Sequence, residues 1–138
     1  MRARALIAGL ALLGAIGTAA LASGSERRVV GNCFKSQAHP GTIILTCADD
    51  NVVLIHVHWR SFGGPSAGAS GIYYANDCVP YCAAGRFHAY PTKLLFSRAR
   101  SCPDGYDDYR LASVTFTGKR PRGLNATDAI PLFCPLKA

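Results

Sequence analysis

The chain has 138 residues, which is the size of one domain. Fifteen Lys and Arg residues against eight Asp and Glu residues give it a net charge of +7 at pH 7. This balance favours anionic envelope polymers, anionic lipid or acidic ligands as partners. The basic residues are scattered, with a single cluster at 119–122, so we expect no nucleic-acid partner.

The first segment, residues 1–22, is predicted to be a secretory signal peptide. Arg2 and Arg4 give it a positive start, residues 6–16 are mostly apolar, and Ala20-Leu21-Ala22 resembles a cleavage site. The apolar stretch is short and interrupted by glycines, and no second one follows, so we expect no transmembrane anchor. Residues 23–138 would then be a single secreted β domain, extracellular or associated with the cell envelope.

Six cysteines follow the predicted cleavage point, and an even count in a short exported chain is typical of a disulfide framework. They are Cys33, Cys47, Cys78, Cys82, Cys102 and Cys134. The sequence does not determine the pairing, and we expect each cysteine to pair with its nearest neighbour in that order. Each bond should add roughly 2–4 kcal/mol to a domain whose core is small.

The first two strands are predicted over 41–47 and 52–60. Turn-forming residues at 48–51 separate them, so the two segments should form a hairpin. Alternation along the second strand predicts two faces. The expected core face is Val53, Ile55, Val57 and Trp59, and the opposite face is Leu54, His56 and His58.

Small residues characterise the next predicted strand, 66–74, where Ala67, Ala69 and Gly71 share one face. Such a face lets a bulky side chain approach closely, and Trp59 is the expected neighbour. A cysteine-bearing loop is predicted over 75–85, followed by a strand over 86–97. Pro91 lacks the N–H of an interior strand, so this strand is expected at a sheet edge or at a bulge.

The last clear strand is predicted over 109–117, with Ala112, Val114 and Phe116 on one face. The tail after Gly118 is expected to be a loop. No segment sustains the 3.6-residue period of a helix. About six short strands between turns rich in Gly and Pro predict an all-β fold, a small disulfide-stapled antiparallel sandwich or barrel.

Two histidines, His56 and His58, alternate on one predicted strand and should project side by side, which is half of a metal site. The other ligands would have to come from His39, His88 or the Asp49–Asp50 turn. Two polar residues are also ordinary on the solvated face of a strand. We adopt that interpretation and keep a metal-dependent enzyme using His56 and His58 as an alternative.

Cys78 and Cys82, followed by His88, could supply three zinc ligands, but export to an oxidising compartment favours disulfides. The acidic segment 104–108 does not have the spacing of an EF-hand loop and is predicted to be a solvated turn. We therefore expect no metal and no cofactor.

A set of positions between Cys47 and Phe96 resembles a group of small exported actinobacterial proteins of unknown function. The matching residues are Cys47-Ala48-Asp49-Asp50-Asn51, Trp59, Gly63, Ala67, Gly71, Asn76, Cys78, Pro80, Cys82-Ala83-Ala84-Gly85, Phe87 and Tyr90-Pro91. The chain departs from the pattern at Asp50, where the group often has Gly, and at Phe62, where it often has Trp. The resemblance implies export and a β-rich domain, and it implies no activity.

The sequence contains no credible set of catalytic residues, so we expect a non-catalytic binding or envelope-interacting module. Its partner would be an anionic envelope polymer or a secreted protein. Exposed Tyr and Arg side chains would form the binding face, with Tyr73, Tyr74, Tyr81, Arg86 and Tyr90 as candidates. An inhibitor of a secreted hydrolase is an alternative, because 77–82 could project as a rigid, disulfide-framed loop.

Overall fold

The computed structural model describes residues 27–136, so the predicted signal peptide lies outside the described residues. These residues form strands and one turn of 3-10 helix, which confirms the predicted all-β fold. The elements are β1 Arg28–Asn32, β2 Lys35–Gln37, β3 Ile43–Ile44, β4 Val52–Ser61, β5 Ser66–Asn76, η1 Cys82–Ala84, β6 Phe87–Ser97, β7 Arg100–Ser101, β8 Asp107–Asp108, β9 Leu111–Phe116 and β10 Thr127–Pro131.

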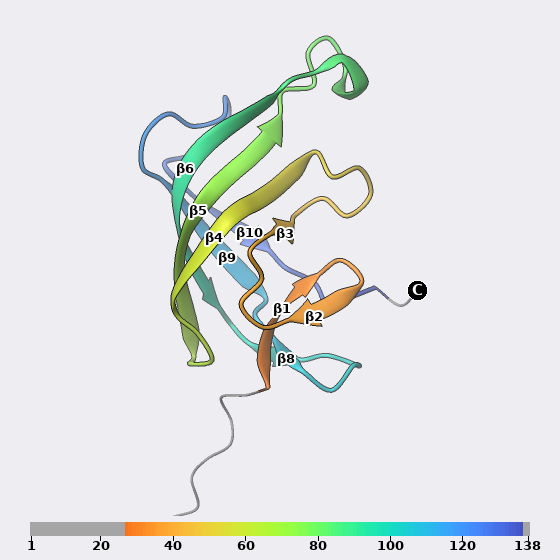
Figure 1. Ribbon diagram of the computed structural model, residues 1–138, viewed down its shortest axis with the longest axis vertical. Coiled ribbons are helices and arrows are strands. Elements are labelled where there is room, and N and C mark those ends of the chain that lie inside the picture. Colours follow the sequence, from red (N-terminus) through yellow and green to blue (C-terminus); the bar gives the residue numbers. More distant parts are fainter. Residues whose placement is uncertain (1–26, 137–138) are drawn as a thin grey trace, which may run out of the picture.

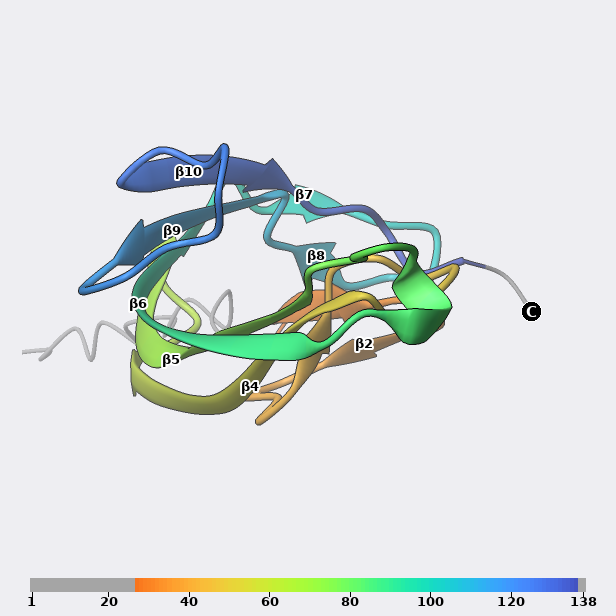
Figure 2. The ribbon, with the colours of Figure 1, turned by 90° about the horizontal axis from the view of Figure 1, so that it is seen from above.

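Six strands form one antiparallel sheet in the order β10-β9-β6-β5-β4-β3. The sheet curls so strongly that β9 and β10 stand across the interior from β4 and β5 (Figures 1 and 2). A smaller sheet, in the order β2-β1-β8-β7, lies against the open side of the curl (Figure 2). Strong twist and coiling of this kind let a single sheet enclose its own core.

The β3–β4 hairpin is confirmed, but the predicted core face of β4 is wrong in its first half. Leu54 is fully buried, whereas Val53 and Ile55 are only partly buried. The cause is a β-bulge, because Ile55 pairs with Ile72 while His58 pairs with Ser70. The bulge leaves one extra residue on β4, and His56 adopts a left-handed φ of 51°. Side chains before His56 therefore face opposite to the predicted alternation, and Val57 and Trp59 after it face the core as predicted.

The single tryptophan packs against small residues of β5, as predicted. Trp59 lies directly across from Ala69 in the β4–β5 register, and both Ala67 and Ala69 are fully buried. The indole ring packs on Phe96 at a centroid distance of 4.9 Å, and its Nε1–H donates to the Pro40 carbonyl at 3.0 Å. The small side chains of Ala67 and Ala69 leave room for the indole ring at this part of β5.

The predicted edge position of the Pro91 strand is wrong, because β6 lies between β5 and β9. Pairing of β6 with β9 runs only from Thr92 to Ser97. The Pro91 carbonyl accepts a bond from the Thr117 N–H at 3.0 Å, and the missing N–H of Pro91 prevents the reciprocal bond. Proline is thus tolerated in an interior strand because it stands where one ladder ends.

The predicted faces of β9 are confirmed, with Ala112, Val114 and Phe116 buried. The tail after Gly118 is not all loop, because β10 pairs with β9 along Thr127–Pro131. Two further strands, β1 and β2, precede the first predicted strand. Strand β1 pairs in parallel with the distant β8, at Arg28↔Asp107 and Val29↔Asp108.

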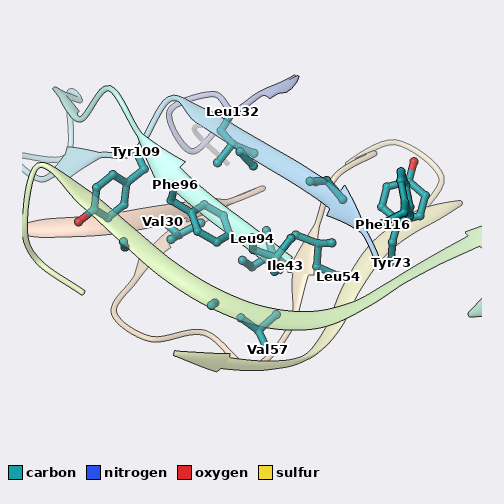
Figure 3. Packing of buried hydrophobic residues seen from close by; sticks show 14 of the residues in the cluster. Val30, Ile43, Leu54, Val57, Tyr73, Leu94, Phe96, Tyr109, Phe116 and Leu132 are labelled. Carbon is teal, nitrogen blue, oxygen red and sulfur yellow. The ribbon is translucent and has the colours of Figure 1, made fainter. Parts of the chain in front are cut away.

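The core lies inside the curl, between the two sheets (Figure 3). It draws on β1, β3, β4, β5, β6 and β9, and on Tyr109 and Leu132 in the connections. Tyr109 is fully buried, and its hydroxyl donates to the Gly64 carbonyl at 2.8 Å. This bond ties the β4–β5 turn to the segment before β9 and satisfies a polar group that would otherwise be costly to bury.

Three disulfides join Cys33 to Cys47, Cys78 to Cys82, and Cys102 to Cys134, which are the predicted pairs. The first ties the end of the β1 strand to the segment after β3, and the third ties the tail after β10 to the segment after β7. Both link segments that belong to different parts of the fold. The second closes a short loop at one end of the large sheet.

Candidate functional site

Two loops open at the same end of the six-stranded sheet, drawn uppermost in Figure 1. Residues 77–86 connect β5 to β6, and residues 117–126 connect β9 to β10. Because β6 pairs with both β5 and β9, the two loops open on the same side of the fold. We call these two segments the loop end.

The disulfide-closed loop at this end is held by a dense set of hydrogen bonds. Asn76 Oδ1 accepts from the Cys78 N–H at 3.0 Å, and Asn76 Nδ2 donates to the Cys82 carbonyl at 2.8 Å. Asp77 Oδ1 accepts from the N–H groups of Val79 and Arg86 at 3.1 and 2.9 Å. Hydrogen bonds made by the side chains of Asn76 and Asp77 thus continue where the backbone hydrogen bonds between β5 and β6 end.

Glycine is required where this loop closes. A Cβ on Gly85 would collide with Asn76 Oδ1 and would lie 2.8 Å from the Cys78 nitrogen. The close approach lets the side chain of Asn76 bond both ends of the loop. The result is a loop with defined geometry although it lies outside the core.

Two apolar side chains project from this loop. Val79 is 67% exposed and Tyr81 is 63% exposed, and they flank Pro80. They are among the most exposed large hydrophobic side chains of the described residues. Neither Val79 nor Tyr81 contributes to the core, so packing within the domain does not explain why they are exposed together.

Asp77 also orients a histidine. His88 Nε2 lies 2.8 Å from Asp77 Oδ2. Hydrogen bonds from the Arg86 N–H, from His88 and from the Val79 N–H lower the pKa of Asp77 to about 2. The carboxylate is therefore ionised and can only accept, so His88 Nε2 carries a proton and its Nδ1 is left for another partner.

A groove of about 830 Å³ lies between the two loops. Asp77, His88 and Tyr90 line it on one side, and Arg120 and Arg122 line it on the other. The Arg120 Nε–H donates to the Leu124 carbonyl at 2.9 Å, which fixes the direction of that guanidinium. The groove thus combines a positioned histidine, a tyrosine ring and two cationic side chains.

The predicted binding face does not form as one surface. Tyr73 is only 7% exposed and packs against Phe116 in the core, so it is not available to a partner. Tyr74 is on the outer face of the sheet, where its ring stacks on Phe87 at 4.9 Å. Tyr90 lines the groove, and Tyr81 and Arg86 belong to the loop. The strand alternation separates neighbouring tyrosines onto opposite faces.

His56 and His58 are both exposed and line a shallow hollow on the outer face of the sheet, beside Lys93. No third His, Cys, Asp or Glu joins them within metal-binding distance in residues 27–136. His39, one of the expected further ligands, packs instead on Phe62 at 4.1 Å, and His88 is bound to Asp77.

In the two other candidate metal sites the cysteines are not free to act as ligands. Cys78 and Cys82 are joined to each other, so their sulfurs are not free thiolates for zinc. The predicted solvated turn at 104–108 is wrong for Asp108, which is fully buried. Cys102, Asp104 and Asp108 do lie together, but the Cys102 sulfur is in a disulfide.

Asp104 and Asp108 share a single hydroxyl donor. Ser36 Oγ lies 2.6 Å from Asp104 Oδ2 and 3.0 and 3.1 Å from the two oxygens of Asp108. One hydroxyl proton cannot serve both carboxylates. Burial raises the pKa of Asp108, and the hydrogen bond that the Ser36 hydroxyl donates partly offsets that rise.

Comparison with models of known protein families, with curated protein sequences and with solved structures gives no match. Among residues 27–136, no helix has the length and apolar character to cross a membrane.

The residues of the groove were largely missed by sequence reasoning. Arg120 and Arg122 were noted only as part of the basic cluster at 119–122, His88 only as a possible metal ligand, and Asp77 only as part of a projecting loop. The sequence signal is weak, because the groove depends on strand pairing between β6 and β9 rather than on spacing along the chain.

Proposed function

We propose that this protein is a non-catalytic, disulfide-stabilised extracellular module that binds a partner through its loop end. One observation carries the proposal, namely that Val79 and Tyr81 are exposed on a loop held in a single geometry by a disulfide and by Asn76 and Asp77. The three disulfides fit a protein that works in an oxidising compartment.

A rigid exposed loop favours binding for an energetic reason. Association costs conformational entropy when side chains and loops become ordered, roughly 0.5–1.5 kcal/mol for each flexible side chain. The loop at 77–86 is ordered before a partner arrives, so this cost is reduced. Tyrosine beside an aliphatic side chain is also the composition of many interface anchors.

The composition of the groove supports a role without catalysis. Among its lining residues there is no Ser, Thr or free Cys beside His88. The Asp77–His88 pair therefore lacks the adjacent nucleophile that a catalytic triad requires. In this proposal Asp77 shapes the loop and orients His88.

The test is capture from the producer's own cell envelope and culture fluid with oxidised mature protein. The variant Val79→Ser/Tyr81→Ser should lose the captured partner. A matched control, Leu95→Ser/Tyr106→Ser, removes side chains that are 48% and 45% exposed elsewhere on the molecule and should retain it. Equal capture by both variants, or no saturable capture by the wild-type protein, would overturn the proposal.

Inhibition of a secreted hydrolase is a second candidate function, favoured by the same rigid loop. Inhibitors of this kind present a preorganised exposed segment to an enzyme cleft and bind tightly because little order is lost. A panel of secreted proteases and lysozymes, assayed with wild-type protein and with Tyr81→Ser, tests it. Absence of inhibition at micromolar concentration removes this candidate.

A further inference from the structure

We infer that the groove of the loop end binds the oxyanion groups, carboxylate or phosphate, of an acidic glycan, with Arg120 and Arg122 as donors and His88 as a further polar contact. This rests on the proposed function, because the groove adjoins the loop that would engage the partner. It adds to that proposal the chemical class of the ligand and the residues that recognise it.

The first support is unbalanced charge. The one ion pair within residues 27–136 is Asp77–His88. Arg120 and Arg122 are both exposed and have no carboxylate within 4.0 Å in that part of the chain. Two guanidinium groups with one intervening residue, facing one concave surface, raise its local positive potential.

The second support is preorganisation of the donors. The bond from Arg120 Nε to Leu124 limits the rotation of that side chain and leaves its two terminal nitrogens without a partner among the described residues. A guanidinium offers a planar fork of N–H groups that matches the two oxygens of a carboxylate or phosphate. Pro121 stiffens the segment between the two arginines.

The third support is His88. Its Nε2 proton is committed to the ionised Asp77 carboxylate. Its other ring nitrogen, Nδ1, has no hydrogen-bond partner among the described residues and is left for a hydroxyl group of the glycan. The titratable and charged groups lining the groove with it are Asp77, Tyr90, Arg120 and Arg122.

Other anionic ligands fit this geometry less well. The arginines line a hollow whose wall carries Tyr90 and His88, whereas a membrane surface would need the cations on a protruding face. Single-stranded nucleic acid needs a basic track with several stacking platforms, and here Tyr90 is the one tyrosine that lines the groove. A pyranose ring has an apolar C–H face that can pack on one aromatic ring while its acidic substituent reaches the arginines.

The test is isothermal titration of oxidised mature protein with defined polymers. The probes are an oligogalacturonate, which bears carboxylates, and a poly(glycerol phosphate) glycopolymer, which bears phosphates. A neutral oligosaccharide of equal length, a single-stranded oligonucleotide and vesicles of phosphatidylglycerol are the comparisons. We expect at least one acidic glycopolymer to bind, with an affinity that falls as salt is raised. The two polymers show which oxyanion is preferred.

Variants locate the site. Arg120→Gln/Arg122→Gln should weaken binding by at least about tenfold, since it removes two charged groups that each donate hydrogen bonds to an oxyanion. His88→Gln should weaken it less. The control Arg100→Gln/Lys93→Gln makes the same charge change at exposed positions outside the groove lining and should bind like the wild type.

Each failure has a separate meaning. Equal binding of the neutral oligosaccharide, tighter binding of the oligonucleotide or vesicles, or equal losses in the groove and control variants would overturn this inference. If loop-dependent capture from the envelope persists while neither acidic glycopolymer binds, the inference fails and the proposed function stands. If capture also fails, both are wrong.

Discussion

Removal of the disulfides one at a time should reduce stability in the order of the loops that they close. Cys102–Cys134 spans 32 residues, Cys33–Cys47 spans 14 and Cys78–Cys82 spans 4. With loop-closure entropy proportional to the logarithm of loop length, the expected losses are about 3.7, about 3.0 and about 1.9 kcal/mol. Together they are comparable to the whole free energy of unfolding of a small domain.

The structure gives a second reason to expect the stability losses in this order. Cys33 and Cys102 are buried, and their bonds hold the small sheet and the tail against the large sheet. The Cys78–Cys82 bond lies at an exposed loop that is already held by Asn76. Removing it should therefore leave the global fold nearly intact and should chiefly weaken binding by the loop end.

Urea denaturation of the three Cys→Ala double variants measures these losses, with the remaining disulfides verified by intact mass. The m-value should stay close to that of the wild type if the denatured state is equally exposed. If loss of Cys78–Cys82 costs as much as loss of Cys102–Cys134, then the crosslinks do not act by restricting the unfolded chain, and the reasoning is refuted.

Three further predictions concern single positions. Gly31→Ala should destabilise the protein by about 1–3 kcal/mol, because its Cβ would strike the Phe133 carbonyl and lie 2.8 Å from Asp108 Oδ2; thermal melting measures this. His56→Gly should stabilise it by up to about 1 kcal/mol and His56→Val should destabilise it, because only glycine adopts the φ of 51° at the bulge without strain. The raised pKa of Asp108 means that the folded state binds its proton more tightly than the unfolded state does. The wild type should therefore lose stability as pH rises, and Asp108→Asn should not show this loss. The contribution of Asp108 is complete below the unfolded pKa of about 3.9 and is lost as pH rises through the higher folded pKa, which urea midpoints between pH 3 and pH 8 would show.

Controls make these results interpretable. Gly118→Ala has open space around its Cβ and should melt like the wild type; an equal loss at both glycines would contradict the packing argument. Equal stability of the His56→Gly and His56→Val variants would show that the bulge is not strained. The pH effect of Asp108 is read as a difference from Asp108→Asn, because Asp77, with a pKa of about 2, contributes stability above its unfolded pKa and loses it in acid. A constant difference across the pH range would contradict the Asp108 assignment.

Much of the large sheet could be predicted because its strands follow simple local rules. Strand β9 alternates strictly, so the buried residues Ala112, Val114 and Phe116 were identified correctly. Strand β4 breaks the rule within a stretch that looks regular. The extra residue at His56 changes the facing of the preceding residues, and no turn residue or glycine marks the bulge in the sequence.

The strands that were missed depend on distant partners. Strand β1 has three consecutive buried residues and so no alternation, and it pairs with β2 on one side and with β8, far along the chain, on the other. Strand β10 is an edge strand with little burial, so its apolar signal is weak. Nearest-neighbour cysteine pairing was confirmed for all three bonds, although only Cys78–Cys82 closes a local loop and the other two join different parts of the fold.

The candidate site could be predicted only in part. Asp77–Cys82 was expected to be a rigid loop, and its Asx residues and disulfide make it one. The groove was not expected, since it requires the long curl of the sheet to bring Arg120 and Arg122 opposite His88. Contacts between side chains that are this far apart along the chain produce no periodic pattern in the sequence.

Residue-resolved NMR mapping tests most directly whether the loop end is the binding surface. Amide spectra of isotope-labelled oxidised protein would be compared with and without the captured envelope fraction or the acidic glycopolymer that binds. The account predicts that the changes concentrate in 76–90 and 118–125 and leave the outer-face hollow at His56 and His58 unchanged. Changes centred on that hollow or on the small sheet, with 76–90 unaffected, would contradict it.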